Sequence, residues 1–310
     1  MIPATSAAPS RVDVLAIDVG GSSIKAARYD RDGLVLDGLQ VPTPPPSRLA
    51  GEITALASWL CGPDTAAVGV VTPGVIDDGV LRYATNLGVR DLPLRELVSA
   101  TVALPTVVGH DVAAAALAES AAIDRDLLFV GLGTGIAAGL VTDGRLLRGV
   151  SGMAGELGHI CVVPGGEACA CGQLGCLEVY ASAAGIARRY ARAAGDADAA
   201  TIVTRLATDP VAATVWAVAT EALSQALATA VQLLDPAVVV LGGGLAEAGP
   251  ALFDPVRAGL EARLRWRPAP EIRPALLGTD ASRAGAALLA WRLVGDVQAA
   301  GHSYEKGAVR

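Results

Sequence analysis

The chain has 310 residues, enough for one large or two medium-sized domains, and 52% of them are hydrophobic, which permits a full core. Its formal net charge is -7 and it has no basic stripe, which argues against a nucleic-acid partner. The longest uncharged run, Leu127 to Thr142, is too short and too rich in glycine to span a membrane. Met1 to Ser10 lacks the basic start and apolar centre of a signal peptide, so clustered thiols indicate a reducing, cytoplasmic compartment.

The first predicted element is a buried strand over Val12–Ile17, because this segment is apolar and β-branched. A glycine-rich turn runs from Asp18 to Ser23, and Ile24–Tyr29 is predicted to be the returning strand. Asp32-Gly33 then favours a second hairpin turn.

The same four features recur later in the chain. Leu127–Val130 is a predicted strand, Gly131 to Gly135 is a glycine-rich turn, Ile136–Thr142 returns, and Asp143-Gly144 closes the second turn. The shared order implies an internal duplication of the architecture, although glycine-rich hairpins are common enough to coincide by chance.

Further elements alternate between strands and helices. The expected strands are Ala66–Val71 and Ala237–Leu241, and the expected helices are Leu49–Leu60, Ala113–Ala122, Ser182–Ala194, Val211–Leu234 and Gly285–Val294. This alternation is typical of an α/β protein, and the duplicated hairpins predict two similar halves around a cleft.

Two glycine-rich turns could bind phosphate, since successive backbone N–H groups converge in such turns. Gly20-Gly21-Ser22-Ser23 and Gly133-Thr134-Gly135 both fit this pattern. Neither is a Walker loop, because the Gly-Lys-Ser/Thr ending is missing, and neither is a Rossmann fingerprint, because a strand follows. One such turn is weak evidence; two at corresponding positions suggest a polyphosphate held from both sides.

Other residues near these turns have two readings each. Asp18, at the end of the first strand, could hold Mg²⁺ through water or could be a simple turn acceptor. Lys25 could lie near phosphate or be an exposed strand residue. Gly242-Gly243-Gly244 could let a nucleotide approach the backbone or could be a strand-to-helix turn.

Four metal-ligand types are gathered in one short segment. His159, Cys169, Cys171 and Cys176 form a set of three thiolates and one imidazole, which is typical of a closed tetrahedral zinc site. A chance run of cysteines or a pair of disulfides is the alternative, but Cys169 and Cys171 are too close for an easy bridge. Cys161 is a spare thiol or replaces one ligand. A zinc site here would also hold Glu156 and Glu178, which flank the ligands, in fixed places.

These motifs resemble the ROK family of bacterial sugar kinases, within the actin-like, ribonuclease H-like ATPase superfamily. The resemblance runs from about Leu15 to about Leu289 and is strongest from Leu127 through Ser182. That part contains Gly-Leu-Gly-Thr-Gly, Asp143-Gly144, Gly155-Glu156-Leu-Gly-His159 and the Cys169–Glu178 segment. The resemblance implies duplicated ribonuclease H-like domains that flank a cleft.

The resemblance also implies roles for individual residues. Asp111 stands where the family has its catalytic base. The sugar-binding positions that it implies are Gly74, Asn86, His110, Asp111, Glu156, His159 and Glu178, with His159 also on zinc. The nucleotide-side positions are Asp18, Gly20, Gly21, Ser22, Thr134, Gly135, Gly243 and Gly244. The implied domains are a smaller one over 1–111, completed by a helix over 285–298, and a larger one over 112–284 with the zinc segment 156–178.

One position departs from the family pattern. Family kinases usually have Glu-Asn-Asp-Ala-Asn before the alanine-rich helix, whereas this chain has Gly109-His110-Asp111-Val112-Ala113. An imidazole has its donor and acceptor on opposite edges of a larger ring, so His110 should not bind the pair of hydroxyls that an amide binds. Either the acceptor sugar differs from glucose, or His110 points away and water replaces the amide.

The expected activity is therefore ATP-dependent phosphorylation of a primary hexose hydroxyl, at the 6-position of a glucose-like sugar. An N-acetylhexosamine or cyclitol kinase and a non-catalytic sugar-binding protein are the alternatives. A sugar-sensing repressor is disfavoured by the short segment before the first strand, and a zinc redox protein by the lack of a Cys-x-x-Cys pair. ATP, Mg²⁺ and structural Zn²⁺ are the expected cofactors, with polyphosphate open as donor. The resemblance suggests a homodimer or homotetramer, without nucleic acid or membrane.

Overall fold

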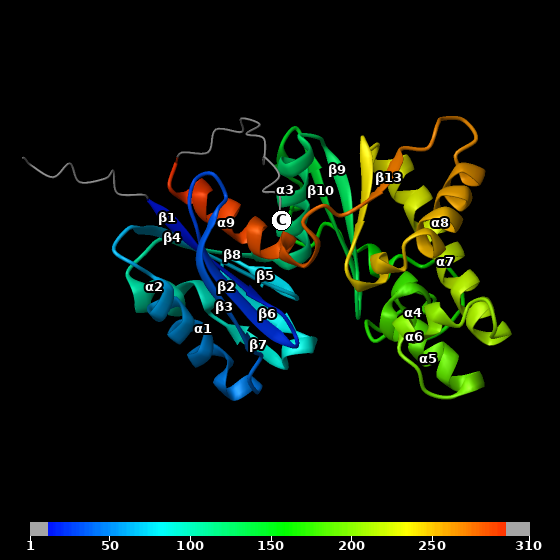
Figure 1. Ribbon diagram of the computed structural model, residues 1–310, viewed down its shortest axis with the longest axis horizontal. Helices are drawn as coiled ribbons and strands as arrows, with labels where there is room; N and C mark the ends of the chain where they lie inside the picture. Colours follow the sequence, from blue (N-terminus) through cyan, green and yellow to red (C-terminus); the bar gives the residue numbers. More distant parts are fainter. Residues whose placement is uncertain (1–11, 296–310) are drawn as a thin grey trace, which may run out of the picture. The chain divides into compact units, whose positions relative to one another are not determined.

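The computed structural model describes residues 12–295, and the chain divides into two compact units (Figure 1). Of the described residues, unit 1 contains 12–121 and 280–295, and unit 2 contains 122–279. The expectations about Met1 to Ser10, and about the last residues of the predicted helix over 285–298, lie outside the described residues.

Unit 1 is built on a five-stranded sheet with the strand order β3-β2-β1-β4-β8. β1, β2 and β3 form an antiparallel meander, whereas β4 runs parallel to β1, and β8 runs parallel to β4. The strands are β1 (Asp13–Val19), β2 (Ser23–Tyr29), β3 (Val35–Pro42), β4 (Thr65–Thr72) and β8 (Thr106–His110). The hairpins predicted around the first glycine-rich turn are therefore present.

The alternation of side chains along β1 sends them to two different cores. Leu15 and Ile17 pack in a core with α1 (Pro46–Leu60) and α2 (Leu94–Val102). Val14 and Ala16 pack on the other face with α3 (Asp111–Ile123) and α9 (Ala281–Leu293). Since Asp18 continues the series of Val14 and Ala16, it belongs to the α3/α9 face.

The last helix, α9, begins four residues before the predicted start at Gly285. Gly285 is an interior residue, because a Cβ there would lie 2.0 Å from the carbonyl oxygen of Ala114 in α3. A Cβ at Gly69 in β4 would likewise lie 2.0 Å from the carbonyl oxygen of Ala286. Gly69 thus lets α9 lie directly against the sheet, where it packs on β1 and β4, and Gly285 lets α9 lie directly against α3.

A small antiparallel sheet in unit 1 was not predicted from the sequence. It consists of β5 (Val75–Asp77), β6 (Val80–Ala84) and β7 (Val89–Leu92), with the 3-10 turn η1 (Thr85–Leu87) between the last two. Its strands are short and half exposed, so they lack the apolar run or strict alternation that marks a longer strand.

Unit 2 repeats the five-stranded plan with the order β11-β10-β9-β12-β13. β9 and β10 are antiparallel, and β12 and β13 extend the sheet in parallel with β9. The strands are β9 (Leu127–Leu132), β10 (Ile136–Thr142), β11 (Arg145–Leu146), β12 (Val238–Gly242) and β13 (Glu271–Pro274). Equal strand order in both units confirms the predicted duplication.

The helices of unit 2 form one core with this sheet. They are α4 (Leu177–Ala181), α5 (Ala183–Ala194), α6 (Ala199–Thr204), α7 (Pro210–Leu234) and α8 (Pro250–Arg263), with short 3-10 turns η2 (Leu157–His159) and η3 (Gly244–Ala248); a further such turn, η4 (Gly278–Asp280), precedes α9. α7 is long and apolar enough to span a membrane by length and composition, but 61% of its apolar window is buried inside the unit. Since its side chains already pack in this core, α7 is a core helix.

Candidate active site and metal centre

The carboxyl ends of the parallel strands β1, β4 and β8 place acidic and polar residues at one edge of the unit 1 sheet. Asp18 is the penultimate residue of β1, and Asp111 follows β8 directly as the first residue of α3. Ligands of parallel α/β sheets bind at such an edge. Unit 1 therefore brings together the predicted base and the predicted magnesium-side carboxylate.

Asp18 and Asp111 are electrostatically linked. Burial raises the pKa of Asp18 from 3.8 to about 7, and the negative charge of Asp111 adds to this shift. Lys25 and Arg283 partly oppose it. A buried carboxyl group that lacks sufficient positive charge is well suited to a cation, and carboxylate oxygens are the ligands that Mg²⁺ prefers.

Asp111 is held by its own helix. Its Oδ1 accepts a hydrogen bond from the backbone N–H of Val112 at 2.7 Å. Nδ1 of His110 lies 3.1 Å from the same Oδ1. The imidazole is therefore adjacent to the candidate base, and His110 also pairs in register with buried Thr72 of β4.

Arg283 is a residue of this region that the sequence did not reveal. Its Nε donates to the Tyr29 hydroxyl at 2.8 Å and its Nη2 donates to Asp280 Oδ1 at 3.1 Å, so the guanidinium is fixed from two sides. Its side chain is only 15% exposed. Tyr29 and Arg283 are 254 residues apart, and no local pattern connects them.

The first glycine-rich turn is a tight hairpin tip. The N–H of Gly20 donates to the carbonyl of Ser23 at 3.0 Å, and Thr43 Oγ1 donates to the carbonyl of Gly20 at 2.6 Å. Ser22 is exposed, and Gly21 lies beside Asn86 of η1, since a Cβ at Gly21 would be 3.7 Å from the Asn86 Cβ. The turn thus meets one of the predicted sugar-side residues.

Gly74 lies just after the end of β4 and packs against β6. It has a φ of +107°, and a Cβ there would lie 2.3 Å from the carbonyl oxygen of Tyr83 in β6. Only glycine fits this close approach. The role of Gly74 in sugar binding stays a prediction.

The second glycine-rich turn, in unit 2, is tied to Glu178. The carboxylate Oε2 of Glu178 accepts from the N–H of Ile136 at 2.9 Å, and a Cβ at Gly135 would lie 2.6 Å from the same oxygen. Thr134 is exposed at the tip. Gly243 packs beside the end of β9, where a Cβ would lie 2.5 Å from the Leu132 carbonyl oxygen, and Gly244 follows in η3.

The four predicted metal ligands meet at one point of unit 2. The ligand atoms of His159, Cys169, Cys171 and Cys176 lie within 4.8 Å of one another. The Sγ atoms of Cys171 and Cys176 are 3.6 Å apart, and Cys169 Sγ is 3.7 Å from His159 Nδ1. Bonds of about 2.3 Å to sulfur in a tetrahedron give ligand separations of about 3.8 Å, so this set fits zinc.

The thiols of this group do not titrate alike, since a hydrogen bond from the backbone of Gln173 lowers the pKa of Cys171. Burial, together with the neighbouring thiols, raises the pKa of Cys176 to about 12. A divalent ion at this point would reverse that shift, because coordinated thiols lose their protons. Cys161 is exposed and does not belong to the ligand group; its backbone forms an isolated bridge with that of Cys176.

His159 presents its two ring nitrogens to different partners. Nδ1 faces the thiols, whereas Nε2 lies 3.8 Å from Glu156 Oε2. The segment that carries both residues is fastened to β10, where the N–H of Ala138 donates to the carbonyl of Gly155 at 2.7 Å. The imidazole of His159 thus lies between the other candidate metal ligands and Glu156, which is predicted to bind sugar.

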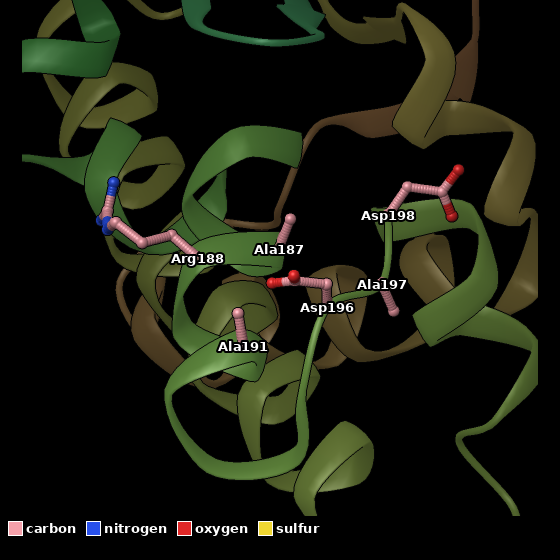
Figure 2. Close-up of a pocket in the computed structure, with 6 residues that line it drawn as sticks. All are labelled: Ala187, Arg188, Ala191, Asp196, Ala197 and Asp198. Atoms are coloured by element: carbon pink, nitrogen blue, oxygen red, sulfur yellow. The ribbon is translucent and has the colours of Figure 1, made fainter.

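A surface pocket of about 460 Å³ lies on unit 2, and none of the predicted site residues lines it. Its lining residues come from α5 and the segment that leads into α6: Ala187, Arg188, Ala191, Asp196, Ala197 and Asp198. Figure 2 shows Asp196 extending between the two helix alanines, while Arg188 extends away from the other labelled residues. Because no predicted site residue lines it, this pocket is not the candidate active site.

Comparison with known proteins identifies the family. The sequence profile of the ROK family matches residues 14–292. The chain belongs to the ROK family. A glucokinase from Halalkalibacterium halodurans is 36% identical over 303 residues, covering 87% of this chain and 92% of that protein. An N-acetylmannosamine kinase from Escherichia coli is 36% identical over 288 residues, covering 89% and 97%.

The fold has a close match among solved structures. A ROK family glucokinase from Streptomyces griseus, in complex with glucose and AMPPNP, superposes with a TM-score of 0.78 at 32% identity, covering 90% of this chain and 99% of that one. The resemblance to the ROK family that the motifs indicated is confirmed. The mixed α/β architecture of two duplicated halves is the actin-like ATPase fold of these kinases.

Proposed function

We propose that this ROK family member is a cytoplasmic kinase that transfers the γ-phosphoryl group of ATP to the primary, 6-position hydroxyl of a glucose-like hexose. Family membership and curated relatives named as sugar kinases make it a sugar phosphotransferase. The observation that carries the finer proposal is the pairing of Asp111 with Asp18 at one sheet edge of unit 1. One carboxylate there can serve the alcohol and the other the phosphoryl side.

Asp111 acts as the general base. Its Oδ1 is engaged by the backbone of Val112, which fixes the orientation of the carboxylate. An ordinary Asp is a far weaker base than an alkoxide, so the proton moves late, as the new O–P bond forms. Most of the acceleration then comes from positioning and from neutralising charge on the transferred group.

Asp18 is assigned to the metal-nucleotide side. When bound, Mg²⁺ would neutralise charge on the phosphates, and Asp18 would hold it directly or through water. Lys25 and Arg283 lie close enough to lower the pKa of Asp18, and they add positive charge to the same region. The turn residues Gly20, Gly21 and Ser22 supply backbone and hydroxyl donors for phosphate.

Unit 2 is assigned the sugar hydroxyls and the second phosphate turn. Glu156, His159 and Glu178 carry polar groups suited to orient hydroxyls, and the separation of His159 Nδ1 from Nε2 lets one imidazole serve both zinc and sugar. Thr134, Gly135, Gly243 and Gly244 are assigned to the nucleotide. Zinc on His159, Cys169, Cys171 and Cys176 is structural, because four protein ligands leave no open position.

A second acceptor class, the N-acetylhexosamines, is supported by two observations. The N-acetylmannosamine kinase is as similar to this chain as the glucokinase is, at 36% identity. His110 also stands in place of the usual amide, next to the base. Cyclitols are the third class of acceptor that we propose. Asn86 and Gly74 are the remaining residues proposed to bind the sugar.

One coupled ADP-release screen tests these assignments. Purified protein is offered ATP with hexoses, N-acetylhexosamines and cyclitols, and polyphosphate replaces ATP in a parallel series. We expect turnover with ATP and a hexose such as glucose to be highest. Turnover confined to N-acetylmannosamine would replace the hexose assignment, and no turnover with any acceptor would leave a non-catalytic sugar-binding protein.

The assembly and domain assignments are separate proposals. We propose that the two compact units are the smaller and larger domains of a kinase that works as a homodimer or homotetramer, without nucleic-acid or membrane partners. Light scattering on the eluting protein measures the mass of the assembly. A mass of 31.1 kDa, that of a single chain, would refute the oligomer.

A further inference from the structure

Glu167 carries three arginines on one carboxylate, in a part of unit 2 that the mechanism above does not use. Arg189 donates to Oε1, Arg192 Nη1 donates to Oε2 at 2.9 Å, and Arg188 Nη2 lies 3.5 Å from Oε2. All three arginines come from α5, and the Glu167 side chain is 23% exposed. Charge-assisted hydrogen bonds of this kind are about twice as strong as neutral ones. These four residues are called the Glu167–arginine cluster.

The backbone of Glu167 is engaged as well. Its N–H donates to the Tyr180 hydroxyl oxygen at 2.8 Å, and its carbonyl accepts from the N–H of Gly175 at 2.8 Å. Glu167 lies two residues before Cys169, and Gly175 lies one residue before Cys176. The same residue therefore joins the two ends of the metal loop that runs from Cys169 to Cys176.

The metal loop leads directly into the candidate site. α4 begins after Cys176 and carries both Glu178 and Tyr180. Glu178 accepts from the N–H of Ile136 in the second glycine-rich turn, and Arg188 also donates to the carbonyl of Val179 in α4 at 2.8 Å. A shift of the loop against α5 would therefore move Glu178 and the thiolates together.

We propose that Glu167 is a positioning residue that fastens the metal loop and α4 to α5, so that zinc retention and sugar affinity both depend on it. The inference rests on the proposed zinc site. Glu167 is not among the metal ligands; it acts on them through the loop. Loss of partners outside the ligand set typically costs about 10- to 100-fold in metal affinity or activity. Removing the carboxylate would also leave three neighbouring guanidinium groups without their shared counter-ion.

The test is Glu167→Gln in the full-length protein, with two readouts. Zinc release into a chromogenic chelator is followed over time, and kcat and KM for the sugar are measured on the zinc-loaded protein. We expect release about 10-fold faster or more, and a KM that rises more than kcat falls. Glu261→Gln, which removes an exposed carboxylate of α8 in the same unit, is the matched control and should change neither.

The outcomes separate this inference from the zinc proposal. Wild-type protein that holds no zinc would overturn both. One equivalent of zinc in the wild type, with unchanged release and KM in Glu167→Gln, would overturn only the role of Glu167, as would a lower melting temperature with both readouts unchanged. If Glu167→Gln does not fold, Arg192→Gln and Arg188→Gln are used instead. Each removes a single contact to Glu167 from a more exposed arginine and should raise the rate of zinc release by a smaller factor.

Discussion

The two five-stranded sheets have the same strand order but opposite chemistry at their functional edges. In unit 1, β1 ends with Asp18 and Val19, and β8 ends with His110 directly before Asp111. In unit 2, the corresponding β9 ends with Leu132, and the counterpart of β8, β13, ends with Arg273 and Pro274. One edge offers carboxylates and an imidazole, whereas the other offers no carboxylate.

This difference shows how a duplicated backbone can divide the work of one reaction. At the edge of unit 1, burial raises the pKa of Asp18 to about 7, and the negative charge of Asp111 adds to this shift. The corresponding strands of unit 2 end without a carboxylate, and β13 instead carries Arg273 next to its last residue. The acidic and imidazole groups of this unit's candidate site come from the segment 156–178, through Glu156, His159 and Glu178. We therefore propose proton transfer and magnesium binding for unit 1, and zinc binding with most of the hydroxyl orientation for unit 2.

The largest expected effect tests whether stability and sugar affinity depend on the four candidate metal ligands of unit 2. Cys176→Ser removes a buried ligand, and structural zinc sites bind with about 10 kcal/mol or more. We expect zinc to be lost, with weaker sugar affinity and a lower melting temperature. Zinc content, sugar KM and thermal unfolding measure this.

Cys161→Ser is the matched control for that prediction, since this thiol is exposed and lies outside the ligand group. It should keep zinc, stability and affinity. A metal-free Cys176→Ser protein with unchanged stability and sugar affinity would mean that the cysteine group is not a structural zinc site.

The second test concerns the buried charge of unit 1. In the folded protein, Asp18 keeps its proton up to about pH 7. In the unfolded chain, where its pKa has the ordinary value of 3.8, it has already lost the proton well below that pH. The contribution of Asp18 to the free energy of unfolding is therefore fully present below pH 3.8 and is lost as the pH rises toward 7. Asp18→Asn should therefore be more stable than the wild type by an amount that grows with pH, up to about 4 kcal/mol.

Urea unfolding in magnesium-free buffer at pH 5 and pH 8 measures this difference. Asp32→Asn, an exposed acid of the same unit, should show no such pH dependence. Activity of Asp18→Asn should fall although its stability rises. If Asp18→Asn were more stable than the wild type by the same amount at both pH values, Asp18 would not be a buried carboxyl group with a raised pKa.

The third test separates proton transfer from sugar binding. Asp111→Asn keeps the shape of the side chain but removes the base, so kcat should fall at least ~100-fold, which is about 2.7 kcal/mol. KM for the sugar should change little. Steady-state kinetics beside Asp32→Asn measures both, and near-normal turnover would remove Asp111 from the mechanism.

The smallest expected effect concerns acceptor choice at the same edge. His110→Asn restores an amide that can bind two adjacent hydroxyls. We expect the ratio of kcat/KM for glucose to that for N-acetylmannosamine to change by about tenfold, or about 1.4 kcal/mol. An unchanged ratio would show that His110 serves Asp111 and not the sugar.

Local features of the sequence predicted much of this molecule. The two hairpins were predictable because strand alternation and glycine-rich turns act over a few residues. The metal set was predictable because His159 and Cys176 are only 17 residues apart and ligand types are chemically distinctive. Short, half-exposed strands such as β5–β7 carried too little periodicity to be foreseen, and the helices α2, α6 and α8 were also not predicted.

Residue types and their order along the chain determined the α/β class, the duplication, the glycine-rich turns and the set of candidate zinc ligands. Only the tertiary structure placed Arg283 beside Tyr29 and Asp280, set Asp111 near Asp18, and gathered three arginines on Glu167. The physical reason is that packing and charge act between residues that are close in space. Such neighbours, here up to 254 residues apart, leave no periodic trace in the chain.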